Sequence, residues 1–218
     1  MLLVLCVFLL PSRRARLRLA PVFANPLGAL ILRILGIRLE VAHRERIDAH
    51  RPAIFVFNHA SELDAIVSMA LWPPYACGIG KIEQARIPLW GQVYGLAGNL
   101  FIDRSDRERA IATMNEAVDI IQRIGMSPWI APEGTRSLDG TLGPFKKGFV
   151  HLAVASGLPL VPIVLHDAHA LWPTKTRTIT PGTVRVTILP PIDTSAWSTD
   201  TVDEHVAATR QVFVDALG

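Results

Sequence analysis

The chain has 218 residues, enough for one α/β domain of ordinary size plus an appended segment. Half of the residues are apolar, yet no run of about 18 uninterrupted apolar residues indicates a membrane-spanning helix. A net charge of +3 suits an anionic partner, but the basic residues do not alternate with aromatic residues, which argues against nucleic acid. The only two cysteines, Cys6 and Cys77, exclude a disulfide framework and favour a reducing compartment.

The first 38 residues form a leader with a charge pattern of its own. Residues 1–39 contain no acidic residue and six arginines: Arg13, Arg14, Arg16, Arg18, Arg33 and Arg38. Residues 1–10 are apolar but too short to span a bilayer, and a second apolar helix is predicted to resume at Asn25 after a proline break. The charges follow the apolar run, unlike those of a secretory signal, so we expect this segment to lie on an anionic membrane surface. The alternative is that its apolar side chains pack on the domain.

Beyond the leader, short apolar runs alternate with helical patterns. This alternation is typical of a single α/β domain, here residues 39–218, with a mostly parallel or mixed central sheet flanked by helices. In chain order, strands are predicted at residues 53–58, 75–80, 99–103, 127–132, 158–165 and 184–190. Helices are predicted at residues 106–124, with a capping box from Ser105 and Glu108, at 149–156, and from 201 to the C-terminus. Residues 172–182 are predicted to form a surface loop.

The heptapeptide NHASELD, residues 58–64, follows the first predicted strand, where open α/β sheets bind ligands. Ser61 and Asp64 have the spacing of a helix N-terminus, so the chain is predicted to turn at His59 and bring Asp64 back to the imidazole. The carboxylate would stabilise the imidazolium and leave the other ring nitrogen to take a proton from a substrate hydroxyl. By itself this spacing is also common around structural histidines, so both interpretations stay open at this point.

Three further segments place groups suited to an anion after apolar strands. Arg104 follows the strand at 99–103 and could hold a phosphate, or equally cap the strand in solvent. The segment APEGTRS offers backbone N–H groups, a hydroxyl, a guanidinium and a carboxylate, from Gly134, Thr135, Arg136 and Glu133. Lys146, just before a predicted helix, could add to the same positive pocket.

Two other candidates are assigned structural roles. His166 and His169 in HDAH have no companion Cys or Glu cluster, so we expect two surface histidines and no metal site. Ser61 could in principle be an acylated nucleophile, but its position suits helix capping.

Taken together, these blocks resemble the glycerolipid acyltransferases, typified by the 1-acyl-sn-glycerol-3-phosphate (lysophosphatidic acid) acyltransferases. NHASELD is similar to that family's NHxxxxD block, KIEQARIPLWGQVYGLAGNLFIDR to its second block, APEGTRS to its FPEGTRS block and LPLVPIVL to its last block. All four occur in the family's order, within residues 51–194. Two departures, Ala131 for phenylalanine and Gln84 for leucine, fall at apolar-wall positions and bear on acceptor or chain-length preference.

The resemblance implies a glycerolipid acyltransferase domain at residues 39–218, with His59 as general base and Asp64 as its partner. It implies that the glycerol phosphate of the acceptor is bound by Arg104, Glu133, Gly134 and Arg136. Lys81 and Gly91 match conserved positions without a clear role.

The implied reaction moves an acyl group from acyl-CoA or acyl carrier protein to the free hydroxyl of lysophosphatidic acid. From the leader, we expect the chain to be held at the cytoplasmic face of a membrane. No metal and no cofactor beyond this co-substrate is expected. Other lysolipids or lyso amino-acid lipids are alternative acceptors. A non-catalytic lipid-binding relative and a His/Asp hydrolase are the rival classes, and the second would need more metal-ligating side chains near His59 if it were metal-dependent.

Overall fold

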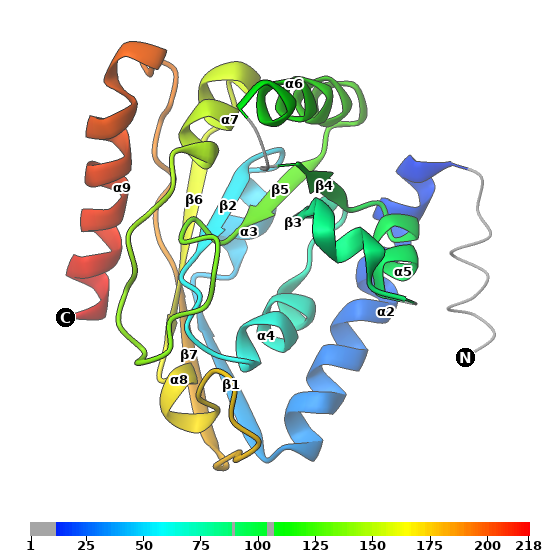
Figure 1. Cartoon of the computed structure of the whole chain (residues 1–218). Helices are drawn as coiled ribbons and strands as arrows, with labels where there is room; N and C mark the ends of the chain where they lie inside the picture. The colour runs from blue at the N-terminus through cyan, green and yellow to red at the C-terminus, as the bar shows by residue number, and fades with distance from the viewer. Residues whose placement is uncertain (1–11, 89, 104–106) are drawn as a thin grey trace.

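The computed structural model describes residues 12–88, 90–103 and 107–218 (Figure 1). Within these residues, seven strands form one sheet in the order β1-β7-β6-β2-β5-β3-β4. The strands are β1 (Ile37–Ala42), β2 (Ile54–Phe57), β3 (Ala76–Lys81), β4 (Leu100–Ile102), β5 (Ser127–Ile130), β6 (Leu160–His166) and β7 (Gly182–Ile188). A central sheet with flanking helices confirms the predicted α/β fold class.

Strand direction decides which loops meet. Strands β6, β2, β5, β3 and β4 run parallel to one another, whereas β7 is antiparallel to β6 and β1 is parallel to β7. The carboxyl ends of the five parallel strands therefore lie along one edge of the sheet, the usual ligand edge of an open α/β fold. The segments after β2, β5 and β6 become neighbours there, although they are far apart in the sequence.

Helices cover both faces of the sheet (Figure 1). One face packs against α6 (Arg107–Ile124), α7 (Gly148–Ser156) and α9 (Val202–Leu217), and the other against α2 (Arg13–Ile34) and α4 (Leu63–Leu71). The remaining short elements are α3 (Glu45–Ala49), η1 (Ile82–Arg86), α5 (Trp90–Leu96), α8 (Ala168–Leu171) and η2 (Thr199–Thr201).

The central strand β2 contributes side chains to two hydrophobic cores, one on each face of the sheet. Ile54 and Val56 pack into the core under α6, α7 and α9, while Phe55 and Phe57 pack into the core under α2 and α4. Successive side chains of a strand point to opposite faces, so a strand covered on both faces must be apolar throughout. The apolar run at residues 53–57 meets this requirement, and it holds the start of the NHASELD turn rigidly.

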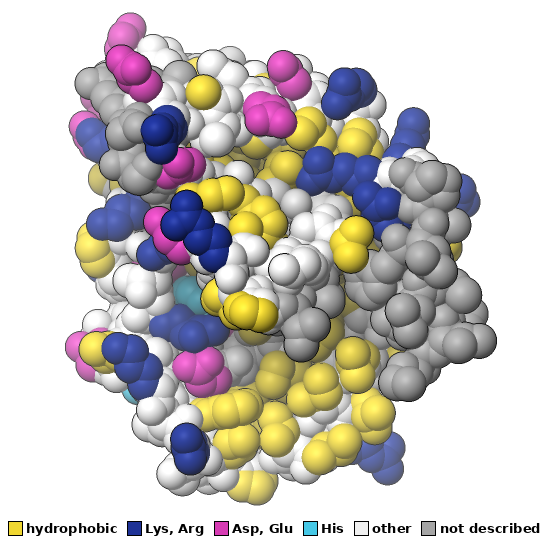
Figure 2. All heavy atoms as spheres, turned by 45° about the vertical axis from the view of Figure 1, so that its right-hand side comes forward, with side chains coloured by type: hydrophobic (Ala, Val, Ile, Leu, Met, Phe, Trp, Pro, Cys, Tyr) yellow, Lys and Arg dark blue, Asp and Glu magenta, His cyan; other side chains and the backbone are white. Residues whose placement is uncertain are grey.

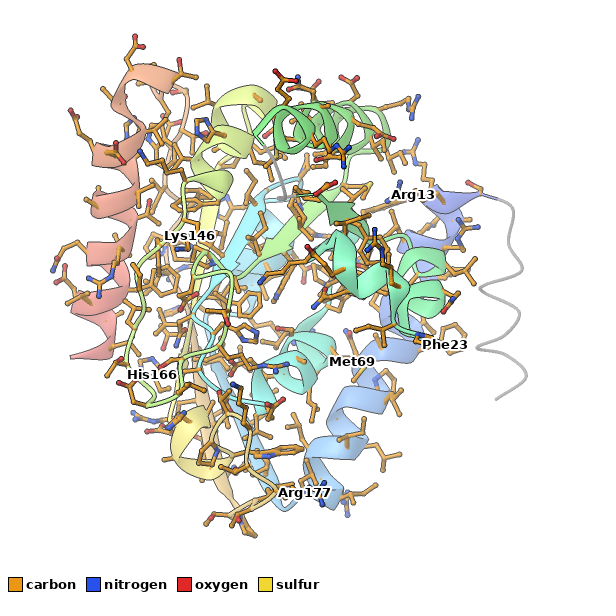
Figure 3. The ribbon with its side chains drawn as sticks, in the orientation of Figure 1. Arg13, Phe23, Met69, Lys146, His166 and Arg177 are labelled. Atoms are coloured by element: carbon orange, nitrogen blue, oxygen red, sulfur yellow. The ribbon has the colours of Figure 1, made fainter. Side chains whose placement is uncertain are left out.

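The helix α2 contradicts one prediction. It runs unbroken from Arg13 to Ile34 with Pro21 and Pro26 inside it, so the predicted proline break is wrong. A proline inside a helix costs about 3 kcal/mol, and tertiary packing must offset this cost. Figure 3 shows α2 and α4 as neighbours, with Phe23 and Met69 labelled on them.

Close packing of α2 against α4 supplies this offset. Pro21, Gly28 and Leu32 are buried on α2, and so is Leu17, which packs into the other core with Ile54 and Cys77. At Gly28 the two helices approach so closely that an added Cβ would lie 2.7 Å from the backbone nitrogen of Ala70. The inner side of the leader therefore belongs to the domain core.

The outer side of α2 is apolar and exposed. By length and composition, α2 is the one helix among the described residues that is long and apolar enough to cross a membrane, and 17 % of its apolar window is buried. Figure 2 shows hydrophobic side chains gathered over the side of the molecule that carries α2 and α4. The large exposed apolar side chains of the helix are Leu19, Val22, Leu27, Leu30 and Ile34.

The sheet begins earlier in the chain than predicted. In β1, Ile37, Leu39 and Val41 are buried or half-buried and alternate with exposed Arg38 and Glu40, and the strand pairs with β7 along its whole length. The predicted boundary between residues 38 and 39 falls inside this strand, so the last residues of the leader are part of the sheet.

The other predicted elements are confirmed, with ends shifted by one or two residues. The six predicted strands correspond to β2 through β7, and the three predicted helices to α6, α7 and α9. Residues 172–181 form the predicted irregular connection, apart from an isolated bridge between Ser61 and Pro173. The apolar run at residues 1–10, Ser105 and Arg104 lie outside the described residues.

Candidate active site

His59 and Asp64 face each other immediately after β2. Nδ1 of His59 lies 2.8 Å from Oδ2 of Asp64, which is the contact predicted from the sequence. The carboxylate is buried, with 1 % of the side chain exposed, whereas 19 % of the imidazole is exposed. Because a carboxylate oxygen accepts, Nδ1 carries the hydrogen. Nε2 is thereby left as the ring atom that can take a proton from a substrate.

Asp64 also builds the turn that presents His59. Its Oδ2 accepts the backbone N–H groups of Ala60 and Ser61, each at 2.8 Å, in addition to the imidazole. The Ser61 hydroxyl accepts the N–H of Leu63 at 3.0 Å, at the start of α4. These contacts are local to one turn, so the spacing of Ser61 and Asp64 is sufficient to produce them.

The turn after β5 holds the backbone of His59 from the other side. Oε1 of Glu133 accepts the N–H of His59 at 3.0 Å, and the N–H of Ser137 donates to the His59 carbonyl at 2.9 Å. The chain reverses at Gly134, whose φ of 73° favours glycine. Glu133 is buried, and this burial raises the pKa of its carboxyl. The contact made by Glu133, a predicted substrate ligand, is thus one that orients His59.

The segment after β6 supports the same turn, which the sequence did not indicate. The carbonyl of Ala60 accepts two hydrogen bonds, from Nδ1 of His169 at 2.7 Å and from the hydroxyl of Thr174 at 3.1 Å. The Ser61 hydroxyl lies 2.9 Å from the carbonyl of Ala168. His169 was predicted to be a surface histidine and is instead half-buried against the turn. The contact joins residues 109 positions apart, so no local spacing signals it.

The second histidine of HDAH has a separate environment. His166 ends β6 on the left of Figure 3, and its Nε2 lies 3.2 Å from the hydroxyl of Thr187. Burial, and next the charge of Arg185, lower the pKa of this imidazole. Within the described ranges, no three His, Cys, Asp or Glu side chains are grouped to hold a metal ion.

The predicted anion-binding residues gather at this edge, except Arg104, which lies outside the described residues. Arg136 stands beside the turn, with its Nη1 3.1 Å from Oε2 of Glu62. Thr135 and Lys146 are exposed and line the same cavity as Glu133 and Gly134. Figure 3 labels Lys146 in the loop that leads into α7.

This cavity has a volume of about 860 Å³ and lies between α6, α7 and the carboxyl ends of β3, β4 and β5. It extends from the turn at residues 131–135 into the interior. Its walls are mostly apolar, with Ile79, Ile102, Met114, Ile130, Phe149 and Leu152 among them, and charged side chains that line it are Lys81, Glu83, Glu133 and Lys146. A largely apolar cavity that reaches Glu133, whose carboxylate holds the backbone N–H of His59, suits a substrate with a long hydrocarbon chain and one reacting polar group.

Comparisons with known proteins place the chain in a family. A family model described as Acyltransferase matches residues 38–166, more than half of the sequence. The chain belongs to the acyltransferase family. Over 211 residues, this acyltransferase is 42 % identical to a 1-acyl-sn-glycerol-3-phosphate acyltransferase of Limnanthes douglasii, and the match covers 97 % of this chain and 74 % of that one. Over 196 residues, it is 33 % identical to a protein of the same name from Escherichia coli strain K12, and that match covers 90 % of this chain and 74 % of the relative.

A solved structure supports the family assignment. The crystal structure of the 1-acyl-sn-glycerophosphate (LPA) acyltransferase from Thermotoga maritima matches the acyltransferase with a TM-score of 0.74 at 28 % identity. The match covers 96 % of this chain and 86 % of that one, so it includes both cores and the ligand edge of the sheet.

The contact of Thr174 with the turn of His59 gives a first prediction. We expect Thr174→Val to lower kcat of the acyltransferase about threefold to tenfold with little change in KM, since a hydrogen bond worth about 1 kcal/mol leaves the Ala60 carbonyl. Thr174→Ser keeps the hydroxyl and should retain most of the activity. Steady-state kinetics and thermal melts of both variants check this. An unchanged kcat for Thr174→Val together with a lower melting temperature would show that the contact only stabilises the fold.

Proposed function

We propose that this acyltransferase moves a fatty acyl group from an acyl thioester to the free hydroxyl of lysophosphatidic acid, which gives phosphatidic acid. The observation that supports this most directly is the buried carboxylate of Asp64 on Nδ1 of His59, which leaves Nε2 as a base. Glu133, which accepts the backbone N–H of His59, lines the largely apolar cavity. Relatives from plants, bacteria, yeast and mouse bear this activity in their names.

The proposed mechanism needs one proton acceptor. Nε2 of His59 takes the proton of the acceptor hydroxyl as the hydroxyl oxygen bonds to the thioester carbonyl carbon. The Asp64 carboxylate, 2.8 Å from Nδ1, stabilises the imidazolium that forms. The tetrahedral intermediate then collapses, the C–S bond breaks, and the imidazolium returns its proton to the departing sulfur. The atoms and charges balance with the ester and a free thiol as products, and the cycle needs neither a metal nor a further cofactor.

Direct transfer is favoured over an acylated enzyme. The Ser61 hydroxyl is fully buried and bonded to Leu63 and Ala168, so it is poorly placed to attack a thioester. Cys77 is buried, and burial raises the pKa of its thiol to about 12. A thiol with this pKa stays protonated at neutral pH and is a poor nucleophile.

The two substrates would divide the site between them. The apolar cavity accommodates a single fatty acyl chain, with its reacting end at the turn of residues 131–135. The acceptor phosphate would be bound by the cations of Arg136 and Lys146 and by the hydroxyl of Thr135. Arg104 is included because it follows β4 in the sequence. Gly134 provides the close backbone approach that an anion needs.

A labelled-donor assay tests the proposal. The purified chain is incubated with lysophosphatidic acid and with either labelled acyl-CoA or labelled acyl carrier protein. Labelled phosphatidic acid is expected with at least one donor, and the better donor identifies the co-substrate. Labelled free fatty acid as the only product would indicate a hydrolase, and no product with either donor would indicate a lipid-binding relative. Other lysolipids and lyso amino-acid lipids in the same assay rank the acceptors.

We further propose that the outer side of α2 lies in the interface of a membrane, at its cytoplasmic face. The exposed apolar side chains would enter the lipid, while Arg14, Arg18 and Arg33 contact anionic headgroups at about 1 kcal/mol each. An excess of arginine flanking an apolar helix favours the cytoplasmic side. A lysolipid would then reach the site from the bilayer and the acyl donor from the cytosol.

Because the inner side of α2 is part of the core, the membrane proposal is best tested on its outer side. We expect the triple substitution of Val22, Leu30 and Ile34 by serine to lower sedimentation with anionic vesicles at least tenfold, since burial of each large apolar side chain is worth about 1.5–3 kcal/mol. Leu138→Ser, at an exposed site with 64 % of the residue accessible, is the matched control. Unchanged sedimentation of a folded triple variant would contradict the proposal.

A further inference from the structure

Glu62 occupies a variable position of the NHxxxxD pattern, between the turn of His59 and the helix α4. Its carboxylate is held from two sides. Nη1 of Arg136 lies 3.1 Å from Oε2 and 3.3 Å from Oε1, and the backbone N–H of Lys175 donates to Oε1 at 3.3 Å. The loop after α8 and the turn after β5 thus meet on a single carboxylate, three residues from the proposed general base.

The guanidinium of Arg136 still lacks a partner on one edge. Its Nε is buried and has no hydrogen-bond acceptor among the described residues. A ligand can reach the other atoms of this side chain, because 36 % of it is exposed although Nε is buried. An anion bound there would share Arg136 with Glu62, because one guanidinium has donors on more than one edge.

Sharing Arg136 has a consequence for charge. The side chains of Arg136 and Glu62 are 36 % and 26 % exposed, so their charges are only partly screened by water. Glu62 offsets the positive charge of Arg136 before any acceptor arrives. A phosphomonoester, with a second pKa of about 6, is close to a dianion at neutral pH and would be repelled by the neighbouring carboxylate more strongly than a monoanionic phosphodiester.

We infer that Glu62 is a specificity-determining residue: it weakens the binding of a dianionic phosphate at Arg136 and so narrows the preference for phosphomonoester over phosphodiester acceptors. This inference rests on the proposed function for its choice of acceptor. Weaker binding also favours turnover, because the product carries the same phosphate as the acceptor. Uniform binding of substrate and product headgroups would slow product release without helping the reaction.

The test compares Glu62→Gln with Glu45→Gln. The glutamine removes the charge and keeps an oxygen that can accept from Arg136. Glu45 is an exposed residue of α3, which precedes β2 and therefore lies at the opposite edge of the sheet. Calorimetric titration with sn-glycerol 3-phosphate measures phosphate binding without any turnover. Glu62→Gln is expected to tighten this binding about threefold to tenfold at pH 8, and less at pH 5.5 where the phosphate is a monoanion. Glu45→Gln should bind like the unchanged protein.

Kinetics with two acceptors of one chain length completes the test. Glu62→Gln should lower KM for lysophosphatidic acid about threefold to tenfold and change KM for lysophosphatidylglycerol less, with kcat equal or lower. Unchanged or weaker phosphate binding, or an equal effect on both acceptors, would overturn the role of Glu62. Failure of the unchanged protein to acylate lysophosphatidic acid would instead overturn the proposed function, while tighter sn-glycerol 3-phosphate binding by the variant would still support the role of Glu62.

Discussion

Replacing His59 with alanine is expected to lower acyl transfer by about 100-fold to 10,000-fold, the range that a positioned proton acceptor contributes. Asp64→Asn is expected to lower kcat within the same range, because a neutral amide cannot stabilise the imidazolium. The loss should fall on kcat rather than on KM, since both groups act as the hydroxyl proton moves. Initial rates at saturating acceptor and donor measure it.

Two controls separate chemistry from folding. His59 is partly exposed, so its replacement should leave the melting temperature almost unchanged, and added imidazole should restore part of the activity of His59→Ala. His50→Ala changes a histidine just after α3, at the opposite edge of the sheet, and should retain full activity. A folded His59→Ala variant with near-normal turnover would refute the general-base assignment.

The second large effect is expected from Arg136→Ala. Removing this guanidinium should raise KM for lysophosphatidic acid about 10-fold to 100-fold, because hydrogen bonds to charged groups are worth about 1.5–3 kcal/mol. The loss should be larger than the arginine's contribution alone, since Glu62 then faces the phosphate without a compensating charge. The value of kcat should change less than KM.

Acceptor chemistry distinguishes this binding role from a structural one. With monoacylglycerol, which has no phosphate, Arg136→Ala should act like the unchanged protein. Arg123→Ala, an exposed change in the last turn of α6, should leave both acceptors unaffected. An equal loss of activity on both acceptors would mean that Arg136 serves the turn rather than the substrate.

The pair of His59 and Asp64 could be predicted from the sequence because all of its determinants lie within one turn. An apolar run buried on both faces ends at Phe57, and the capping spacing of Ser61 and Asp64 then returns the carboxylate to the ring. Both features are local, and so are the periodic patterns of α6, α7 and α9.

Predictions from the local sequence were wrong where tertiary packing outweighed the local conformational preference of the residues. Pro21 and Pro26 predicted a break, but the contact of Gly28 with α4 holds α2 as one helix. Arg38 was predicted to be the last residue of a basic leader, yet its neighbours Ile37 and Leu39 add β1 to the sheet by pairing with a strand that begins at Gly182.

Local patterns in the sequence were sufficient to predict the fold class, most strands and helices, and the histidine and carboxylate at one strand end. The groups around that pair depend on contacts between distant segments of the chain. Glu133 and His169 contact the turn across 74 and 109 positions, and Glu62 meets Arg136 across 74. Such contacts exist because parallel strands bring their carboxyl ends to one edge of the sheet, and neither residue type nor local spacing encodes which loops then meet.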